Sequence, residues 1–421
     1  MTTDAAAGPP WGLQGREGPV PKGRFDSALV LSGSIGKGHD SVAAACGAAL
    51  GTTGLRAEVL DCMSMLGGPG SRLGTAVFRR MISAPAVYDG FHFTQLRNGT
   101  LLARALERTA VRTMLPDVRR AVAGAGDEPL LISVFPTGVS TVATLKRERA
   151  DLVAVAVCTD ACAHRMWVAE GTDLYVVCSP LARLTVRRYA PRARIAVVPP
   201  PVRPEFYAAP TRRDARTSLG VPADARCVLL MAGGWGIGPL DTTAEVLARA
   251  GYWVLAVAGA NTRLFQRLAD VAARRRRVVP FAMTDRIPEL MAAADAVVTS
   301  SGQTCHEARV VGRRLVILDV VPGHGRENTL HELEQGGALA CSPDPASVEA
   351  AVRAALADRQ APPAWPVRSA AEWEGHLLGA LSAVGIGAPP LMGGGDGRSS
   401  HHRSGPAGPQ VPRPAARAGV R

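Results

Sequence analysis

Short apolar runs alternate with stretches of helical pattern from about residue 27 to residue 350. The runs are rich in Val, Leu, Ile and Ala, and most are followed by glycine or a polar residue. This alternation is typical of parallel sheets covered by helices. It predicts strands at 28–33, 57–61, 130–135, 152–157, 174–178, 195–199, 227–233, 253–259, 278–281, 296–300 and 315–320.

Three consecutive prolines in "VVPPPVRPEF" (197–206) divide these strands into two groups. Proline is excluded from helix interiors and central strands, so we expect a domain boundary there. The predicted fold is α/β of the GT-B type, with two Rossmann-like domains, 25–200 and 201–385, facing each other across a cleft. Residues 1–24 and 386–421 are rich in Pro, Gly and Ala without periodicity, which predicts disordered tails.

The balance of charge changes the range of expected partners. The chain carries 48 Lys and Arg against 36 Asp and Glu, a net charge of +12, which favours anionic partners. No basic stripe is interleaved with aromatic residues, so nucleic acid is not expected. The Arg-rich segment 72–120 contains "LLARALERTAVRTML" (101–115), an amphipathic pattern with a basic polar face. Such a helix could lie on an anionic membrane surface or pack as an ordinary surface helix.

Targeting signals and metal sites are not apparent. No segment reaches the roughly 18 uninterrupted apolar residues of a spanning helix, and the first residues lack the features of a signal peptide. We therefore expect a cytoplasmic protein, with peripheral attachment at the inner face of the cell membrane as an option. Only Cys158 and Cys162 of the eight cysteines lie close in sequence, which favours buried thiols over a metal site. The oligomeric state stays open.

Two glycine-rich turns each open one half of the chain. "LVLSGSIGKGHDSVAAACGAAL" (29–50) runs from a strand through Gly36, Lys37 and Gly38 into a helix. Glycines allow close approach of the backbone, and a helix start presents free N–H groups to an anion. "MAGGWGIGPL" (231–240) repeats the scheme. Either turn alone could be only a tight connection, but the pair suggests a ligand cleft.

A third element, "VVTSSGQTCHEARVVGRRLVIL" (297–318), runs strand, polar turn, helix and strand. Hydroxyls and amides at 300–304 could bind a phosphate at that helix start, and Glu307 is placed to accept from ribose hydroxyls. His306 is expected to point into packing. "PGHGREN" (322–328) then follows the next strand and puts polar groups on the same rim.

At these residues the chain resembles the GT-B glycosyltransferases. It is most similar to the monogalactosyldiacylglycerol synthases and processive diacylglycerol glucosyltransferases, relatives of the peptidoglycan transferase that forms lipid II. The resemblance rests on six stretches in family order, at 31–45, 79–92, 159–190, 231–240, 283–308 and 322–328.

The resemblance implies a role for each matching residue. His39 would be the general base on the acceptor hydroxyl or an orienting group, since the pKa of an imidazole lies near working pH. Asp160 and His164 would be catalytic or acceptor-binding, although both could instead cap a helix or satisfy a turn. The implied donor-binding residues are Gly233, Gly234, Ser301, Gly302, Gln303, Thr304, Glu307, His324 and Asn328.

Several positions depart from the family pattern. Lys37 stands where the group usually has glycine, and Ser300 replaces a lysine before the donor glycine. In the sugar-recognition turn, His324 and Gly325 replace a Gln-Glu pair. The identity of the sugar is therefore open.

Taken together, the resemblance implies an inverting hexosyltransferase that moves a hexose from a nucleotide sugar, most simply a UDP-sugar, to a lipid acceptor such as diacylglycerol. The chain has no D-x-D sequence, so neither a metal nor a cofactor beyond the co-substrate is required. The open alternatives are a soluble natural-product acceptor, a non-hydrolysing epimerase, and a non-catalytic relative that binds nucleotide or membrane. The fingerprint of a dehydrogenase is absent.

Overall fold

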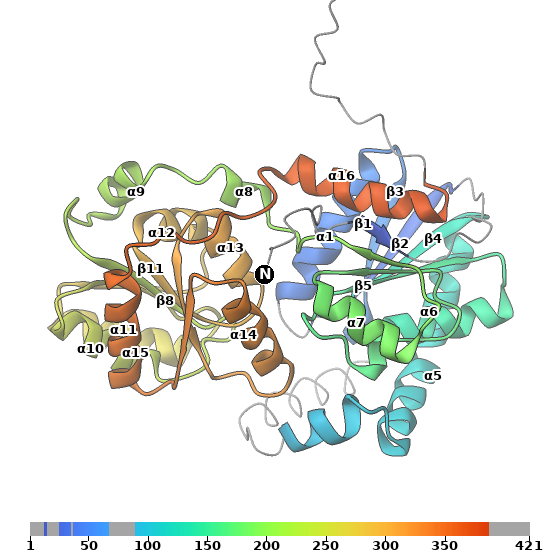
Figure 1. Cartoon of the computed structure of the whole chain (residues 1–421), viewed down its shortest axis with the longest axis horizontal. Helices are drawn as coiled ribbons and strands as arrows, with labels where there is room; N and C mark the ends of the chain where they lie inside the picture. Colours follow the sequence, from blue (N-terminus) through green and yellow to red (C-terminus); the bar gives the residue numbers. More distant parts are fainter. Residues whose placement is uncertain (1–11, 15–24, 35–36, 67–88, 387–421) are drawn as a thin grey trace, which may run out of the picture. The chain divides into compact units, whose positions relative to one another are not determined.

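Two mainly parallel sheets organise the chain in the computed structural model, which describes residues 12–14, 25–34, 37–66 and 89–386 (Figure 1). The first sheet contains β1 (Gly12–Gln14), β2 (Ser27–Ser32), β3 (Arg56–Asp61), β4 (Pro129–Ser133), β5 (Val153–Cys158), β6 (Leu174–Val177) and β7 (Ile195–Val197). The second contains β8 (Cys227–Met231), β9 (Trp253–Val257), β10 (Val278–Phe281), β11 (Ala296–Ser300), β12 (Arg314–Leu318) and β13 (Ala338–Cys341). All eleven predicted strands are therefore confirmed.

Helices connect the strands. They are α1 (Lys37–Gly51), α2 (Cys62–Met65), the π-helix η1 (His92–Leu96), α5 (Leu101–Gly124), α6 (Pro136–Glu148), the 3₁₀ turn η2 (Arg165–Trp167), α7 (Pro180–Tyr189), α8 (Pro204–Tyr207), α9 (Arg212–Leu219), α10 (Leu240–Arg249), α11 (Thr262–Arg274), α12 (Ile287–Ala293), α13 (Gln303–Val310), α14 (His324–Glu334), α15 (Pro345–Ala357), α16 (Ala370–Leu381) and the 3₁₀ turn η3 (Ser382–Val384). Among the described residues, no helix combines the length and hydropathy needed to cross a bilayer.

The order of the strands decides where a ligand can bind. The second sheet has the order β10-β9-β8-β11-β12-β13, all parallel, which is the Rossmann order 3-2-1-4-5-6. In the first sheet the parallel strands run β3-β2-β4-β5-β6-β7. In such sheets ligands bind where the order reverses, beyond the carboxyl ends of the strands. Those points lie between β2 and β4 and between β8 and β11.

The strands are held by burial on both faces. Every residue of β2, β4, β5 and β8 is buried, as expected for parallel strands covered by helices on each side. Each fully buried Leu, Ile or Val contributes about 1.5–3 kcal/mol, so these runs are also the main source of stability. The carboxyl ends of the strands are consequently rigid supports for the loops that follow them.

Helix α16 packs on the first sheet's helix α1 although it follows the second sheet in sequence (Figure 1). Leu377, Leu378 and Leu381 are buried in the core cluster that contains β2, and the indole of Trp373 donates to the Pro199 carbonyl at 2.7 Å. The predicted second domain included this helix. The predicted domain boundaries themselves stay a prediction.

Strands β1 and β13 were not predicted. β1 lies inside the stretch predicted as an N-terminal tail and pairs antiparallel with β7, at the open edge of the first sheet. β13 extends the second sheet beside β12. Ile386, the first residue of the predicted C-terminal tail, is buried in the core cluster of the first sheet, and the other residues of both predicted tails lie outside the described part of the chain.

Candidate active site

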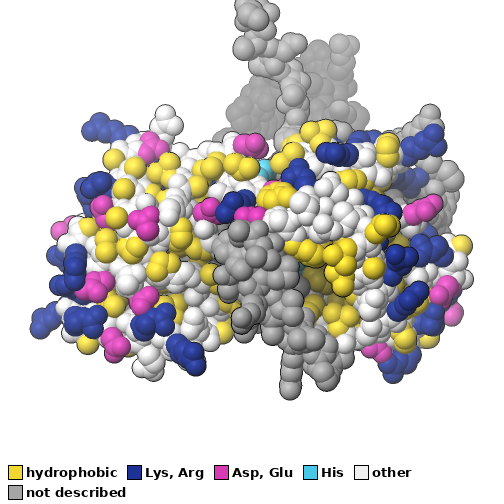
Figure 2. Space-filling view, turned by 90° about the horizontal axis from the view of Figure 1, so that it is seen from below, with side chains coloured by type: hydrophobic (Ala, Val, Ile, Leu, Met, Phe, Trp, Pro, Cys, Tyr) yellow, Lys and Arg dark blue, Asp and Glu magenta, His cyan; other side chains and the backbone are white. Residues whose placement is uncertain are grey.

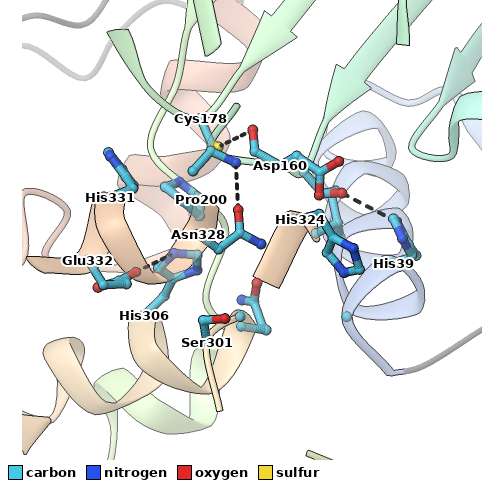
Figure 3. A pocket seen from close by; sticks show the side chains of 16 residues that line it. His39, Asp160, Cys178, Pro200, Ser301, His306, His324, Asn328, His331 and Glu332 are labelled. Atoms are coloured by element: carbon cyan, nitrogen blue, oxygen red, sulfur yellow. Dashed lines mark hydrogen bonds and ion pairs between the residues drawn. The ribbon is translucent and has the colours of Figure 1, made fainter. Parts of the chain in front are cut away.

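One pocket joins loops from the carboxyl ends of both sheets (Figure 3). From the first sheet it is lined by residues at the start of α1 and at the ends of β5 and β6, and from the second by the start of α13 and one face of α14. Both switch points of the strand order therefore contribute to it. The predicted residues that line it are Gly38, His39, Asp160, Ser301, Gly302, Gln303, His324 and Asn328.

His39 lies in the first turn of α1, beside the switch point of the first sheet. Its Nδ1 is 2.8 Å from the carbonyl oxygen of Val134, just beyond β4, and 3.4 Å from Thr159 Oγ1. A carbonyl only accepts, so Nδ1 carries the proton and Nε2 keeps its lone pair. Burial lowers the pKa of His39 while the charge of Asp160 opposes the shift. The neutral imidazole has the tautomer that a general base requires at Nε2.

Asp160 follows β5 and is held by two residues from the matched stretch 159–190. The Trp167 indole donates to Asp160 Oδ2 at 2.7 Å, and His164 Nε2 lies 3.7 Å from the same oxygen. Burial by itself would raise the pKa of Asp160, but the neighbouring imidazoles of His324 and His164 and the indole hydrogen bond hold that pKa below its ordinary value. The carboxylate is therefore ionised beside His39.

His164 does not line the pocket. Its Nδ1 accepts from the Met166 backbone N–H at 3.2 Å and caps the 3₁₀ turn that carries Trp167. Burial lowers the pKa of His164 to about 4, so its ring is neutral. Its geometry matches the capping alternative left open by the sequence, with Asp160 as its neighbour.

The loop after β11 forms the other wall of the pocket. Gly302 precedes α13 with φ of +138°, a conformation that favours glycine, and leaves the amides at the helix start open to a ligand. Ser301 Oγ donates to the Gly325 carbonyl at 2.7 Å, and the Gln303 amide donates to the Pro201 carbonyl. Thr304 lies in the first turn of α13 but is not among the lining residues.

Glu307 is buried one turn further along α13, behind the pocket wall. Its side chain is 8% exposed, and Oε1 lies 3.4 Å from Nε of Arg203, which comes from the segment after the three prolines. Burial raises the pKa of Glu307 to about 7, although the charge and hydrogen bond of Arg203 oppose the shift. A half-ionised carboxyl with one distant partner has acceptor capacity left for a ligand hydroxyl.

The turn 322–328 begins α14 and faces the first sheet. Asn328 Oδ1 accepts from the Ala161 N–H at 3.0 Å, so this predicted sugar contact is engaged with the opposite wall. Burial lowers the pKa of His324, with the charge of Asp160 opposing. A Cβ on Gly325 would come within 2.5 Å of the Val321 side chain, so the glutamate of the family pattern does not fit here. His324 is the one side chain of the substituted pair that faces the pocket.

The second glycine turn lies beside the pocket rather than in its wall. Gly233 and Gly234 follow β8, and the Gly234 carbonyl accepts from the Ala260 N–H at 2.9 Å. Of the predicted phosphate loop, Gly38 lines the pocket, Lys37 begins α1, and Gly36 lies outside the described residues. The roles assigned to all these residues stay predictions.

Glu327 was not predicted, although it lies within the quoted turn 322–328. Its Oε2 is 3.2 Å from His92 Nε2 and its Oε1 contacts Arg97, so it joins α14 to the π-helix η1. Next to it, Asp89 accepts from the Gly323 N–H at 2.7 Å and lies 3.2 Å from Arg326. These contacts fix the turn against the segment 89–97. The sequence alone gives no signal for these contacts, because they join segments that are more than 200 residues apart.

Comparisons with known proteins agree with the fold and the motifs. No family model matches the chain. A probable monogalactosyldiacylglycerol synthase of Glycine max is 27% identical over 267 residues, 60% of this chain and 48% of the relative. A processive diacylglycerol beta-glucosyltransferase of Bacillus licheniformis is 27% identical over 190 residues, 44% of this chain and 49% of the relative. The matched region spans about half the length of these curated relatives.

A solved structure supports the architecture. Sucrose-phosphate synthase of Thermosynechococcus elongatus superposes with a TM-score of 0.51 at 15% identity, covering 85% of this chain and 94% of that one. The predicted resemblance and fold class are thus confirmed: the chain has the GT-B fold and is similar to the monogalactosyldiacylglycerol synthases and processive diacylglycerol glucosyltransferases.

Proposed function

We propose that the chain is an inverting hexosyltransferase that transfers a hexose from a UDP-sugar to a lipid hydroxyl, as in diacylglycerol. One observation carries this proposal: the pocket places the free Nε2 side of a neutral His39 on one wall and the amide-rich start of α13 on the other. The first group suits deprotonation of an acceptor hydroxyl, and the second suits a departing diphosphate.

In the proposed mechanism the donor binds with its diphosphate at the start of α13 and its ribose toward Glu307. The acceptor oxygen attacks the anomeric carbon from the face opposite the diphosphate as His39 Nε2 takes its proton. Asp160 then stabilises the imidazolium, because it is ionised and buried beside His39. The proposed steps use no metal ion.

Inversion is supported by the product named for the Bacillus licheniformis relative, a beta-glucosyltransferase. A beta product from an alpha-linked UDP-glucose requires attack from the opposite face. The test is transfer of labelled hexose from UDP-glucose and UDP-galactose to diacylglycerol in vesicles, with the anomeric configuration read by NMR. A beta product supports the mechanism, and retention of the alpha configuration contradicts it.

Substitution of the proposed base gives the second test. His39→Ala is expected to lower the rate of transfer by about 10²–10⁴-fold, the usual contribution of general-base catalysis, with UDP affinity unchanged. His376→Ala, an imidazole on α16 outside the pocket, is the matched control. Unchanged transfer by His39→Ala would remove His39 from the mechanism.

A lipid acceptor requires access to a membrane, and α5 is the proposed contact. Leu101, Leu102 and Leu106 are 79%, 55% and 54% exposed in its first turns, beside the exposed Arg104 and Arg108. Figure 2 shows hydrophobic and basic side chains together on the face seen from below, the side on which α5 lies in Figure 1. Exposed leucines flanked by arginines suit an anionic bilayer surface.

The membrane contact has its own measurement. Leu102→Ser with Leu106→Ser should weaken sedimentation with anionic vesicles by roughly tenfold or more, since each buried leucine contributes about 1.5–3 kcal/mol. Leu330→Ser, an exposed leucine on α14, serves as the control. Equal vesicle binding by all three proteins would contradict this surface.

A further inference from the structure

Three side chains behind the start of α13 form a buried ionic cluster: His306, Arg309 and Glu332. His306 Nε2 lies 3.3 Å from Glu332 Oε1, and Arg309 Nε lies 2.7 Å from Glu332 Oε2 (Figure 3 shows the first pair). The side chains of Arg309 and Glu332 are 3% exposed. The proposed mechanism uses none of the three.

Arg309 fixes the carboxylate and does not line the pocket. It also donates to the Glu332 backbone carbonyl at 2.8 Å and to the Gly336 carbonyl at 3.0 Å. Burial of Glu332 would raise its pKa, but His306 and Arg309 lower that pKa to about 2. Glu332 is therefore an ionised carboxylate with one oxygen on each partner.

His306 is the member of the cluster that turns toward the loop after β11. It lines the pocket together with Ser301, Gly302 and Gln303, and its ring packs on Trp365 with centroids 5.4 Å apart. A carboxylate only accepts, so Nε2 carries a proton and donates to Glu332. The other ring nitrogen, Nδ1, is buried and has no hydrogen-bond partner among the described residues.

A phosphate oxygen is the group that would satisfy this nitrogen. It also only accepts, so Nδ1 must be protonated to bind it, and the ring must then be an imidazolium. Within 297–310 the basic side chains are His306 and Arg309, and Arg309 is occupied by Glu332. An anion at the start of α13 would thus find its side-chain cation at His306.

We infer that His306 is a positioning residue for the donor diphosphate, which it binds as an imidazolium held by Glu332 and Arg309. The titratable and charged groups around the ring are Glu332 and His331 on α14 and Arg309 on its own helix, with Asp160 and His324 further along the pocket wall. This inference rests on the proposed nucleotide-sugar function.

The test is calorimetry of UDP and of uridine with the wild-type chain and with His306→Gln. His306→Gln should bind UDP roughly 10- to 100-fold more weakly, with uridine affinity unchanged. His376→Gln should behave like wild type.

Each outcome separates the possibilities. Equal losses for UDP and uridine would indicate a merely structural role, and UDP affinity unchanged in His306→Gln would overturn the inference. His306→Asn repeats the measurement if His306→Gln does not fold. If the wild-type chain binds no nucleoside diphosphate, the proposed function fails and the inference with it. If Glu307→Ala abolishes UDP binding while His306→Gln does not change it, only the inference fails.

Discussion

Two of the buried glutamates, Glu307 and Glu327, lie on α13 and α14 in the second half of the chain, yet their surroundings differ. Glu327 has two partners from the first half, His92 at 3.2 Å and Arg97. Glu307 has Arg203 alone, at 3.4 Å. A buried carboxylate is stabilised only when it is paired and hydrogen-bonded. Glu327 therefore stabilises the fold, whereas burial of Glu307 costs free energy that hydrogen bonds from a donor ribose would offset.

The comparison contrasts a carboxylate that stabilises the fold with one that the proposed mechanism assigns to the donor site. Glu307 agrees with the family signature and has spare acceptor capacity, while Glu327 has no counterpart in the predicted site and is fully engaged. Replacing Glu327 should therefore lower the free energy of unfolding, whereas replacing Glu307 should raise it.

Glu327→Gln should lower the free energy of unfolding by about 3 kcal/mol, because it leaves the buried His92 without its carboxylate, whereas the pair with Arg97, 37% exposed, is screened by solvent and adds little. Urea denaturation at pH 7.5 measures the change. Glu334→Gln, an exposed glutamate of the same helix, should stay within about 0.5 kcal/mol of wild type. If both variants are equally stable, Glu327 is not the structural member of the pair.

Glu307→Gln should raise the free energy of unfolding at pH 8 by roughly 2–3 kcal/mol. The folded chain binds the Glu307 proton more tightly than the unfolded chain, so wild-type stability decreases as pH rises from the ordinary pKa of 4.5 toward about 7. The glutamine variant lacks this loss, and the two proteins should converge near pH 4.5. Denaturation at pH 5, 6, 7 and 8 provides the curve, and a difference independent of pH would show that Glu307 is ionised as in water.

Arg203→Ala should change the free energy of unfolding over the same pH range as Glu307→Gln. The change should be smaller, since the Arg203 side chain is 38% exposed and solvent screens the pair. The expected loss is under about 1 kcal/mol at pH 8, with the decline in stability shifted to higher pH because Glu307 loses its cation. The matched control is Arg213→Ala on α9, an exposed arginine. An unshifted pH profile would mean that Arg203 does not act on Glu307.

Much of the fold could be predicted because each central strand is a run of apolar residues buried on both faces. β13, with the sequence ALAC, is short, and two of its four residues are exposed and none is fully buried, so it lacks that pattern. β1 contains Gly12 in a Pro- and Gly-rich stretch and is defined by its pairing with β7, a partner more than 180 residues away. Sequence periodicity carries no information on such an edge pairing.

The candidate site likewise contains residues that the sequence could predict and residues that it could not. His39, Asp160 and Ser301 follow strand ends, and the topology of parallel sheets brings such positions together. Arg203 and Glu327 act through contacts with segments about 100 and 235 residues away, and one sequence does not indicate which charges pair. Trp167 lies within the matched stretch 159–190, but its hydrogen bond to Asp160 depends on the 3₁₀ turn that carries it.

Calorimetric titration of UDP into the wild-type chain and Glu307→Ala tests the central claim most directly, with Glu334→Ala as the matched control. The predicted result is saturable UDP binding that weakens by roughly 10- to 100-fold in Glu307→Ala and stays unchanged in the control. No binding of UDP or any other nucleoside diphosphate, or affinity unchanged by Glu307→Ala, would contradict the assignment of α13 as the donor site.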